Sequence, residues 1–504
     1  MRALLSVWDK TGLVELARGL AELGWELVSS GGTAAALRDA GVPVTEVAEV
    51  TGAPEMLGGR VKTLHPAIHG GILADRSRPE HLDDLAARGI EPIDLVVCNL
   101  YPFRSDPSVE LIDVGGPTMV RAAAKNFDGV GVVVRPEDYG PVLDELREAG
   151  ALSAATRRRL ARAAFAHTAA YDAAIVGWFD SGAEEGDVLP PTVHLALERV
   201  EELRYGENPH QRGARYRPVG SETWWDRVVQ HSGLALSYLN LYDADAAWRV
   251  VHDLARDGRA AAVVVKHANP CGAAVAGDLA TAYQRAYEGD ERSAFGGIVA
   301  LSRVVDGATA ERMVAAAQAD VVIAPGYEDG VVDALRGRRK NTRVLEAPPP
   351  DPIDLELRQV SGGWLVQEPH RWDAGRGEWR VVTKVAPTEE QWADAELAWR
   401  LVGHVRSNAI VLVRGGMAVG IGAGQQNRVE AGQIAAGKAA GRAAGGACAS
   451  DAFYPFPDGV EAAAEAGVAV VVQPGGAMRD DDVVAAADRL GIAMVFTGER
   501  HFLH

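Results

Sequence analysis

The chain has few cysteines and no long apolar run. Its 504 residues include three cysteines, Cys98, Cys271 and Cys448, which lie far apart, so neither a disulfide framework nor a zinc cluster is expected. No stretch approaches the ~18 consecutive apolar residues of a membrane-spanning helix. The apolar run after Met1 is too short for a signal peptide. The sequence therefore predicts a soluble, cytoplasmic protein with no metal site and no membrane partner.

Positive charge is also scarce. The formal net charge is −18, which argues against a nucleic-acid-binding surface or a polybasic membrane patch. Local basic pockets for small anions remain compatible with that balance. A chain of 504 residues exceeds one ordinary domain, and 47% hydrophobic residues supply material for several cores.

Lysine is rare among the basic residues. Of 51 lysines and arginines only seven are lysines. Arginine stays protonated, whereas a lysine can be tuned toward neutrality, so a lysine kept in such a chain is a candidate for chemistry. Four of the seven, Lys10, Lys62, Lys125 and Lys266, fall in the polar segments described below.

Apolar strand-like runs alternate with helical periodicity in the first part of the chain. The pattern predicts strands at 3–8, 25–30, 94–98 and 129–134, and helices at 11–23, 34–40 and 153–179. Such alternation predicts an α/β fold with a mostly parallel sheet covered by helices.

Two composition breaks divide the chain. The acidic, glycine-rich segment 181–191 ends in Pro190-Pro191 and predicts a linker, which gives domains at 1–190 and 191–504. The proline-rich run 347–352 predicts two subdomains in the second domain, with a break near 345–385. The alanine- and glycine-rich segment 437–449 is interpreted as a close-packed helix.

Polar turns follow the strands of the first domain. Ser30-Gly31-Gly32-Thr33 precedes a predicted helix, an arrangement that binds phosphate through backbone N–H groups. The basic loop 60–63 and the helix start at Gly115 add cations and donors, while Tyr101, Asp113 and Lys125 offer proton transfer without a metal. Taken singly, each has a structural explanation as a turn, a helix cap or a solvated charge.

In the second domain the apolar run 260–265 ends in Lys266-His267-Ala268-Asn269-Pro270. A buried strand that ends in such a cluster is typical of a catalytic edge of an α/β sheet. The neighbouring ammonium of Lys266 should disfavour protonation of His267, leaving an imidazole able to accept a proton. A strand that simply ends in a solvated Lys-His pair is the alternative that this stretch alone leaves open.

Other chemistries fit this segment less well. Zinc deaminases use H-x-E followed by P-C-x-x-C, but here Asn269 replaces the glutamate and Ala274 the second cysteine. A pyridoxal-phosphate lysine is disfavoured by the adjacent histidine. The run 420–428 lacks the spacing of a dinucleotide fingerprint, and a glycine turn with Arg428 as an anion clamp fits it better.

The ordered set of these motifs resembles the family of bifunctional phosphoribosylaminoimidazolecarboxamide (AICAR) formyltransferase / IMP cyclohydrolases. The resemblance rests on segments 8–12, 30–33, 60–66, 98–102, 121–126, 204–211, 266–272, 424–428, 450–456 and on Arg500. It implies a methylglyoxal-synthase-like domain followed by two cytidine-deaminase-like subdomains without zinc. It also implies the last two steps of de novo IMP synthesis, with 10-formyltetrahydrofolate as co-substrate, no tightly bound cofactor, and a homodimer.

The resemblance implies roles for individual residues. For formyl transfer it makes His267 the base and Lys266 the oxyanion stabiliser; for ring closure it makes Lys125 the proton donor/acceptor, assisted by Lys62, Tyr101 and Asp113. Nucleotide contacts fall to Asp9, Lys10, Ser30, Gly31, Gly32, Thr33, Arg60, Val61, Thr63, Cys98 and Asn99. AICAR contacts fall to Arg204, Tyr205, Gly296, Asp320, Asn408, Phe453 and Arg500, its phosphate to Arg428, and folate contacts to Asp458 and Ala477.

The sequence departs from the family pattern in places. Trp8 stands where a small residue is expected, the segment 328–395 with Trp364, Trp372 and Trp379 matches poorly, and the end 500–504 is a variant. Two rival interpretations stay open: an effector-binding regulatory module for the first domain, and a deaminase-like hydrolase for the second.

Overall fold

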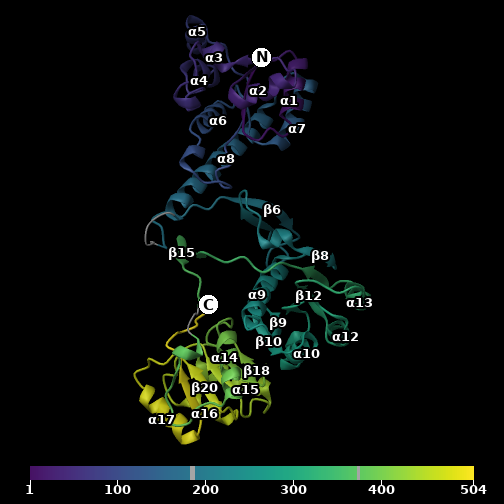
Figure 1. The fold of residues 1–504 in the computed structure, drawn as a ribbon, viewed down its shortest axis with the longest axis vertical. Coiled ribbons are helices and arrows are strands. Elements are labelled where there is room, and N and C mark those ends of the chain that lie inside the picture. Colours follow the sequence, from purple (N-terminus) through teal and green to yellow (C-terminus); the bar gives the residue numbers. More distant parts are fainter. Residues whose placement is uncertain (182–187, 372–374) are drawn as a thin grey trace. The chain divides into compact units, whose positions relative to one another are not determined.

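The computed structural model describes residues 1–181, 188–371 and 375–504 (Figure 1). The chain forms two compact units, Met1–Glu198 with Pro218–Gly220, and Arg199–Arg217 with Ser221–His504. Residues 182–187 of the expected linker, and Trp372, lie outside the described residues.

The described part of the first unit is built on a five-stranded parallel sheet of order β3-β2-β1-β4-β5. Its strands are β1 (Arg2–Val7), β2 (Glu26–Ser29), β3 (Thr45–Glu46), β4 (Leu95–Asn99) and β5 (Gly131–Val133). Strands β1 and β4 are apolar and buried along most of their length, as expected for a sheet with helices on both faces. The predicted parallel α/β sheet is thereby confirmed.

Each face of this sheet has its own core. One core gathers α1, α2 and α7 around Leu16, Leu20 and Leu143, and the other gathers α4, α6 and α8 around Val120 and Tyr171. The helices are α1 (Leu13–Glu22), α2 (Gly31–Asp39), α3 (Val47–Thr51), α4 (Pro66–Leu73), α5 (Pro79–Ala87), α6 (Gly115–Lys125), α7 (Tyr139–Ala149) and α8 (Ala154–Ser181). The sheet therefore presents its polar strand ends between two packed layers of helices.

Within the described residues, the second unit contains a twelve-stranded mixed sheet of order β16-β21-β20-β19-β17-β18-β10-β9-β11-β12-β13-β8. Its strands are β8 (Val229–Ser232), β9 (Ala260–Lys266), β10 (Asn269–Ala276), β11 (Gly297–Leu301), β12 (Ala319–Ala324), β13 (Arg343–Glu346), β16 (Arg380–Val381), β17 (Ile410–Arg414), β18 (Met417–Gly422), β19 (Ala447–Ser450), β20 (Val470–Gln473) and β21 (Ala493–Phe496). The strands before and after the proline-rich run join where β10 pairs with β18. Two separate hairpins, β6 (Leu197–Leu203) with β7 (Gly213–Pro218) and β14 (Glu356–Val360) with β15 (Gly363–Gln367), complete the strands.

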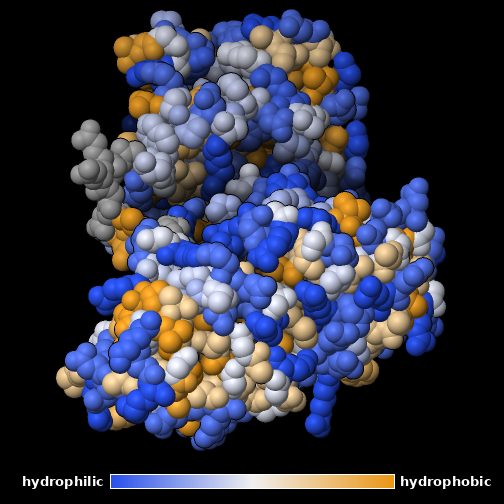
Figure 2. Space-filling view, turned by 60° about the horizontal axis from the view of Figure 1, so that its bottom comes forward, coloured by the Kyte–Doolittle hydropathy of each residue, from blue (hydrophilic) through white to orange (hydrophobic). Residues whose placement is uncertain are grey.

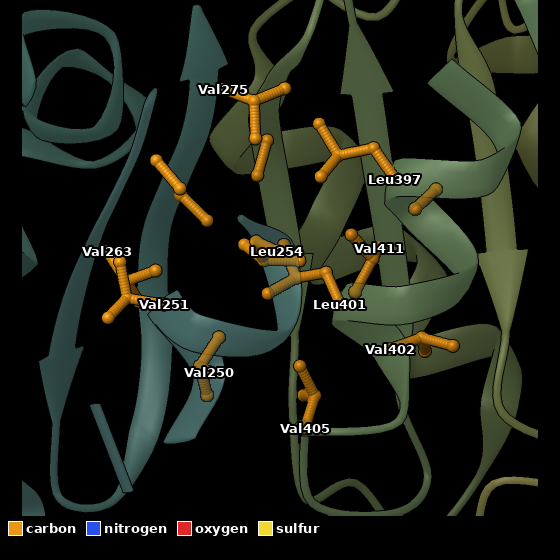
Figure 3. Packing of buried hydrophobic residues seen from close by; sticks show 14 of the residues in the cluster. Val250, Val251, Leu254, Val263, Val275, Leu397, Leu401, Val402, Val405 and Val411 are labelled. Atoms are coloured by element: carbon orange, nitrogen blue, oxygen red, sulfur yellow. The ribbon is translucent and has the colours of Figure 1, made fainter. Parts of the chain in front are cut away.

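Helices α9 (Tyr238–Leu254) and α14 (Glu389–Val402) share one large core on this sheet. In Figure 3, Val251 and Leu254 of α9 and Leu397 and Leu401 of α14 gather in the same cluster as strand residues such as Val263. Two further cores hold the remaining helices, α10 (Leu279–Gly289), α11 (Glu291–Ala294), α12 (Gly307–Ala315), α13 (Val331–Arg338), α15 (Arg428–Ala439), α16 (Asp458–Glu465) and α17 (Asp480–Leu490). The side chain of Trp248 is fully buried in the core that α9 and α14 share, so α9 is fixed against the strands that carry the candidate site.

The predicted helix over 437–449 is wrong. Helix α15 ends at Ala439, Ala440 and Gly441 have positive φ angles of 47° and 82°, and residues 447–450 form strand β19. A left-handed pair ends a helix because it breaks the i to i−4 hydrogen-bond pattern. Alanine propensity is overridden here by pairing of β19 with β17 and β20.

The surface shows mixed character. Hydrophilic and hydrophobic residues are interspersed over the face shown in Figure 2. Among the described residues, no helix is long and apolar enough to cross a membrane.

Candidate active sites

In the first unit, the amino end of α2 is fixed beside the end of β1. The Val7 N–H donates to Thr33 Oγ1 at 3.0 Å, and this hydroxyl donates back to the Val7 carbonyl at 3.0 Å. Ser30 is the N-cap residue, and Gly31 begins the helix with a φ of 54°. The predicted phosphate turn is therefore a rigid helix start at the carboxyl edge of the parallel sheet.

Two lysines approach this helix start. A Cβ added to Gly31 would lie 2.9 Å from Lys62 Nζ, and one added to Gly32 would lie 3.9 Å from Lys10 Nζ. The glycines thus leave room for ammonium groups close to the backbone. Lys62 Nζ also pairs with Glu55 Oε2 at 3.1 Å. Two cations at the positive end of a helix dipole favour an anionic group at this position.

Asn99 ties the loop after β1 to the loop after β4. Its Oδ1 accepts the N–H groups of Trp8 at 2.7 Å and Asp9 at 2.9 Å, and its Nδ2 donates to the Asp9 carbonyl at 2.9 Å. Trp8, where a small residue was expected, packs edge-on against Tyr101 with ring centroids 5.3 Å apart. The hydroxyl and backbone N–H of Thr11 hold the pKa of Asp9 below its ordinary value.

Asp113 caps the start of α6. Its Oδ1 accepts the Gly116 N–H at 2.8 Å, and Thr63 Oγ1 lies 3.3 Å from where a Cβ on Gly115 would be. Burial raises the pKa of Asp113, although the backbone N–H groups of Gly116 and Gly115 oppose the rise. Loop 60–63, the end of β4 and the start of α6 therefore meet around a carboxyl group that is easier to protonate than usual.

Other predicted residues of this unit behave differently. Burial, and secondarily the Asp113 carboxylate, raise the pKa of the Cys98 thiol, so this thiol stays protonated. The Arg60 guanidinium pairs with Glu110. Lys125 is the last residue of α6, about 15 Å along the helix from Gly115 at 1.5 Å per residue. Within one chain Lys125 therefore stands apart from the group at the start of α6.

In the second unit, Lys266 and His267 belong to a hairpin. Lys266 ends β9 and pairs with Asn269 at the start of β10, which makes His267 and Ala268 the two turn residues. Because β9 is antiparallel to both β10 and β11, the cluster lies at a tight turn and not at a crossover to a helix. His267 is solvent-accessible in this position.

Lys266 reaches across to the segment before β11. Its Nζ donates to the Phe295 carbonyl. A Cβ on Gly296, whose φ is 68°, would lie 3.4 Å from Lys266 Nζ and 3.9 Å from Asp320 Oδ1. Three predicted residues from β9, the start of β11 and β12 thus converge, with glycine leaving space between an ammonium and a carboxylate.

Arg343 on β13, which the sequence did not single out, extends this group. Burial lowers the pKa of Arg343, while charge interactions with Asp320 and Tyr205 raise it and Arg204 lowers it. Arg204 lies over the Tyr205 ring, 4.8 Å from its centroid. The charge of Arg343 therefore lies near both the predicted turn 204–205 and Asp320, while its guanidinium donates to the Ala235 carbonyl at 3.2 Å. A lone arginine in a short strand carries no sequence signal of this.

A second group forms around Asp451, which is completely buried. Arg428 Nη2 donates to Asp451 Oδ1 at 2.8 Å, and Ser407 Oγ donates to Asp451 Oδ2 at 2.5 Å. Arg428 Nη1 also donates to the Phe453 carbonyl at 3.2 Å. The predicted anion clamp Arg428 is thus already paired with a buried carboxylate that was not among the predicted site residues.

The remaining predicted residues lie in loops, apart from Asp458 at the start of a helix. Asn408 Nδ2 donates to the Gln425 carbonyl at 2.9 Å, and Arg500 lies 4.3 Å from the Phe502 ring centroid. Asp458 begins α16, and the Ala477 N–H donates to Asp480 at 3.2 Å. No group of three His, Cys, Asp or Glu side chains suited to a metal ion occurs in residues 1–181, 188–371 and 375–504.

Comparison with known proteins gives consistent similarities. Residues 12–127 match the MGS-like domain, and residues 123–438 match the AICARFT/IMPCHase bienzyme family. A bifunctional purine biosynthesis protein PurH from a Cyanothece species is 49% identical over 100% of this chain and 99% of its own length. Proteins of the same name from Sorangium cellulosum and Cereibacter sphaeroides are 52% and 50% identical over 100% of this chain and 99% and 98% of theirs.

Proposed function

The chain belongs to the AICARFT/IMPCHase bienzyme family, and from that premise we propose which of its residues carry each of the two reactions. It is a bifunctional enzyme of purine biosynthesis. It transfers a formyl group to AICAR and closes the ring of formyl-AICAR to give IMP, the last two steps of the pathway. The family uses a folate co-substrate, which we propose is 10-formyltetrahydrofolate.

Formyl transfer falls to the hairpin of the second unit. His267 takes a proton from the weakly nucleophilic amine of AICAR as its nitrogen bonds to the formyl carbon. Lys266 stabilises the oxyanion that develops on the formyl oxygen. The carbon–nitrogen bond to the folate then breaks, and the proton passes to the leaving folate nitrogen.

AICAR lies between the two groups of the second unit in this proposal. On the side of Lys266, AICAR contacts Arg204, Tyr205, Gly296 and Asp320. On the other side it contacts Asn408, Arg428, Phe453 and Arg500, and Arg428 binds its phosphate. Asp458 and Ala477 lie along the folate. The observation that supports this arrangement most is the convergence of Lys266, Gly296 and Asp320 from three separate elements.

Ring closure falls to the first unit. The carboxamide nitrogen of formyl-AICAR attacks the formyl carbon, and water is lost. The phosphate binds at the start of α2 between Lys10 and Lys62, with Ser30, Gly31, Gly32, Thr33, Arg60, Val61, Thr63, Asp9, Cys98 and Asn99 around the nucleotide. Asp113, whose pKa burial raises, exchanges protons there with Tyr101 and Lys62. Lys125 is kept as a proton donor/acceptor from the family resemblance.

The partners we propose are these small molecules and a second copy of the chain, in the cytoplasm, with no nucleic acid or membrane and no tightly bound cofactor. The domain assignment proposed is 1–190 for cyclohydrolase and 191–504 for formyltransferase.

The test separates the two reactions. Wild type, His267→Ala and Lys62→Ala are each given AICAR with 10-formyltetrahydrofolate, or formyl-AICAR alone. Absorbance follows the release of tetrahydrofolate, which reports transfer, and the formation of IMP from formyl-AICAR, which reports cyclisation. His267→Ala should lose transfer and keep cyclisation, while Lys62→Ala should keep transfer and lose cyclisation. Lys125→Ala that cyclises at the parental rate would remove Lys125 from the mechanism.

Two results would overturn the assignments. Ammonia release from AICAR without folate, or loss of activity on chelation, would favour a deaminase-like hydrolase. Nucleotide binding by the first unit without turnover of formyl-AICAR would favour a regulatory module.

A further inference from the structure

Helix α8 of the first unit carries a buried tyrosine, Tyr171, in the core that α8 shares with α6. The ring of Phe103 packs edge-on against its ring, with centroids 6.0 Å apart. Arg104 Nη2 donates to the carbonyl of Ala170, the residue before it, at 3.0 Å. At this point α8 is therefore tied to the loop after β4, the loop that also carries Tyr101.

The hydroxyl of Tyr171 bridges two backbone groups just before α6. It accepts the Asp113 N–H at 2.9 Å and donates to the Leu111 carbonyl. Burial raises the pKa of Tyr171, so the hydroxyl keeps the proton that it donates. A phenol donates one hydrogen bond and can also accept, so the two bonds use both functions of this group.

Asp113 is held from two sides. Tyr171 binds its backbone N–H, and its own Oδ1 accepts the Gly116 N–H at 2.8 Å. A Cβ added to Gly116 would overlap Asp113 Oδ2, so the carboxyl lies directly against the backbone of α6. Ile112 and Asp113 belong to no helix or strand, and their backbone groups find partners through tertiary contacts such as this bridge.

We propose that Tyr171 is a positioning residue for ring closure, whose hydroxyl holds the 111–113 backbone so that the carboxyl of Asp113 stays against the start of α6; this inference rests on the role proposed above for Asp113. The hydroxyl suits the task because one atom fixes the backbone at two points, before and at Asp113. Without it, the Asp113 N–H and the Leu111 carbonyl would lose their partner, which favours movement of this segment toward water.

The experiment uses the full-length protein with Tyr171→Phe and Thr168→Val. Tyr171→Phe removes the hydroxyl and keeps the ring in the core. Thr168 is the matched control, because its buried hydroxyl lies on the same helix and donates to the Phe165 carbonyl of that helix at 3.2 Å. Steady-state cyclisation gives kcat and KM for formyl-AICAR, and hydrogen–deuterium exchange with mass spectrometry follows the backbone N–H groups of 111–113. Formyl transfer, a reaction of the other unit, is measured on the same preparations.

Misplacing a catalytic group by about 1 Å can lower a rate by about 100-fold. Because the Gly116 N–H still holds the carboxyl in Tyr171→Phe, we expect a smaller loss, about 10-fold in kcat of cyclisation, with KM within about twofold of wild type. Exchange should become faster at 111–113 and stay unchanged in β4 and α6. Thr168→Val should match wild type in cyclisation and exchange, and both variants should transfer formyl at the parental rate.

Distinct results separate the possible failures. A kcat within about twofold of wild type for Tyr171→Phe, or a raised KM with unchanged kcat, would overturn the positioning role while leaving the proposed function intact if Asp113→Asn is impaired in cyclisation. A parental rate in Asp113→Asn would overturn both the proposed role of Asp113 and this inference. A lower kcat with unchanged exchange at 111–113, with faster exchange throughout α6 and α8, or with loss of transfer as well would show that Tyr171 does not act through Asp113, and would also overturn the positioning role.

Discussion

Acid should destabilise the second unit through His501. This side chain is completely buried; its ring lies 4.1 Å from that of Trp399, and its Nδ1 lies 2.7 Å from His370 Nε2. Burial, followed by the neighbouring charges of His370 and His404, lowers the pKa of His501 to about 3, from an ordinary value of 6.5. The neutral imidazole is therefore the form that fits the folded chain.

The sign and size of the effect follow from linkage. Because the unfolded chain binds a proton at this histidine near pH 6.5 and the folded chain does not, the stabilisation is complete above that pH and is lost as the pH falls below it. At about pH 5 the loss from this residue alone is RT ln(1 + 10^1.5), about 2 kcal/mol.

The assay compares wild type with His501→Gln, which removes the titrating group, and with His210→Gln, which alters an exposed histidine. Urea unfolding is followed by tryptophan fluorescence at about pH 7.5 and pH 5. The wild type and His210→Gln should lose about 2 kcal/mol more free energy of unfolding between these pH values than His501→Gln does. Equal losses in all three proteins would refute the reasoning, because buried histidines elsewhere contribute equally to each.

Two further predictions concern ion pairs. Glu55→Gln should lower the KM of cyclisation by up to about fivefold, because it frees Lys62 from a pair that is partly exposed and worth at most about 1 kcal/mol; a raised KM in steady-state assays would contradict this. Asp451→Asn should lower the free energy of unfolding by about 3 kcal/mol, because the amide keeps one acceptor oxygen but leaves the buried Arg428 charge without its counter-charge; urea unfolding at neutral pH measures it, and a loss below about 1 kcal/mol would show that water replaces the pair.

Local patterning foresaw β1, β2, β4 and β5 of the first unit, and β9 of the second. Predicted strands at 25–30, 94–98 and 260–265 correspond to β2, β4 and β9, because continuous β-branched and aliphatic runs bounded by polar turns have few other solutions. The prediction for segment 437–449 failed because its alanines favour a helix locally, while pairing with strands far away in the sequence makes residues 447–449 part of β19.

The candidate sites were foreseen unevenly for a related reason. The glycine turn indicated Gly31 as a candidate site residue, and the scarcity of lysine indicated Lys62 and Lys266. The roles of these residues are proposals. Arg343 gave no signal, since it is an ordinary charge on a strand and acquires its neighbours only through packing. Proximity across elements is a property of tertiary structure that spacing along one segment does not encode.

The pairing of β10 with β18 has a practical consequence for dissecting the enzyme. Cleaving the chain in the proline-rich run 347–352 would give two fragments, each with an apolar edge strand whose backbone N–H and C=O groups have lost their partner strand. Such exposed edge strands promote aggregation. Each half of the second unit expressed alone should therefore be insoluble. Halves that are co-expressed should assemble through the pairing of β10 with β18.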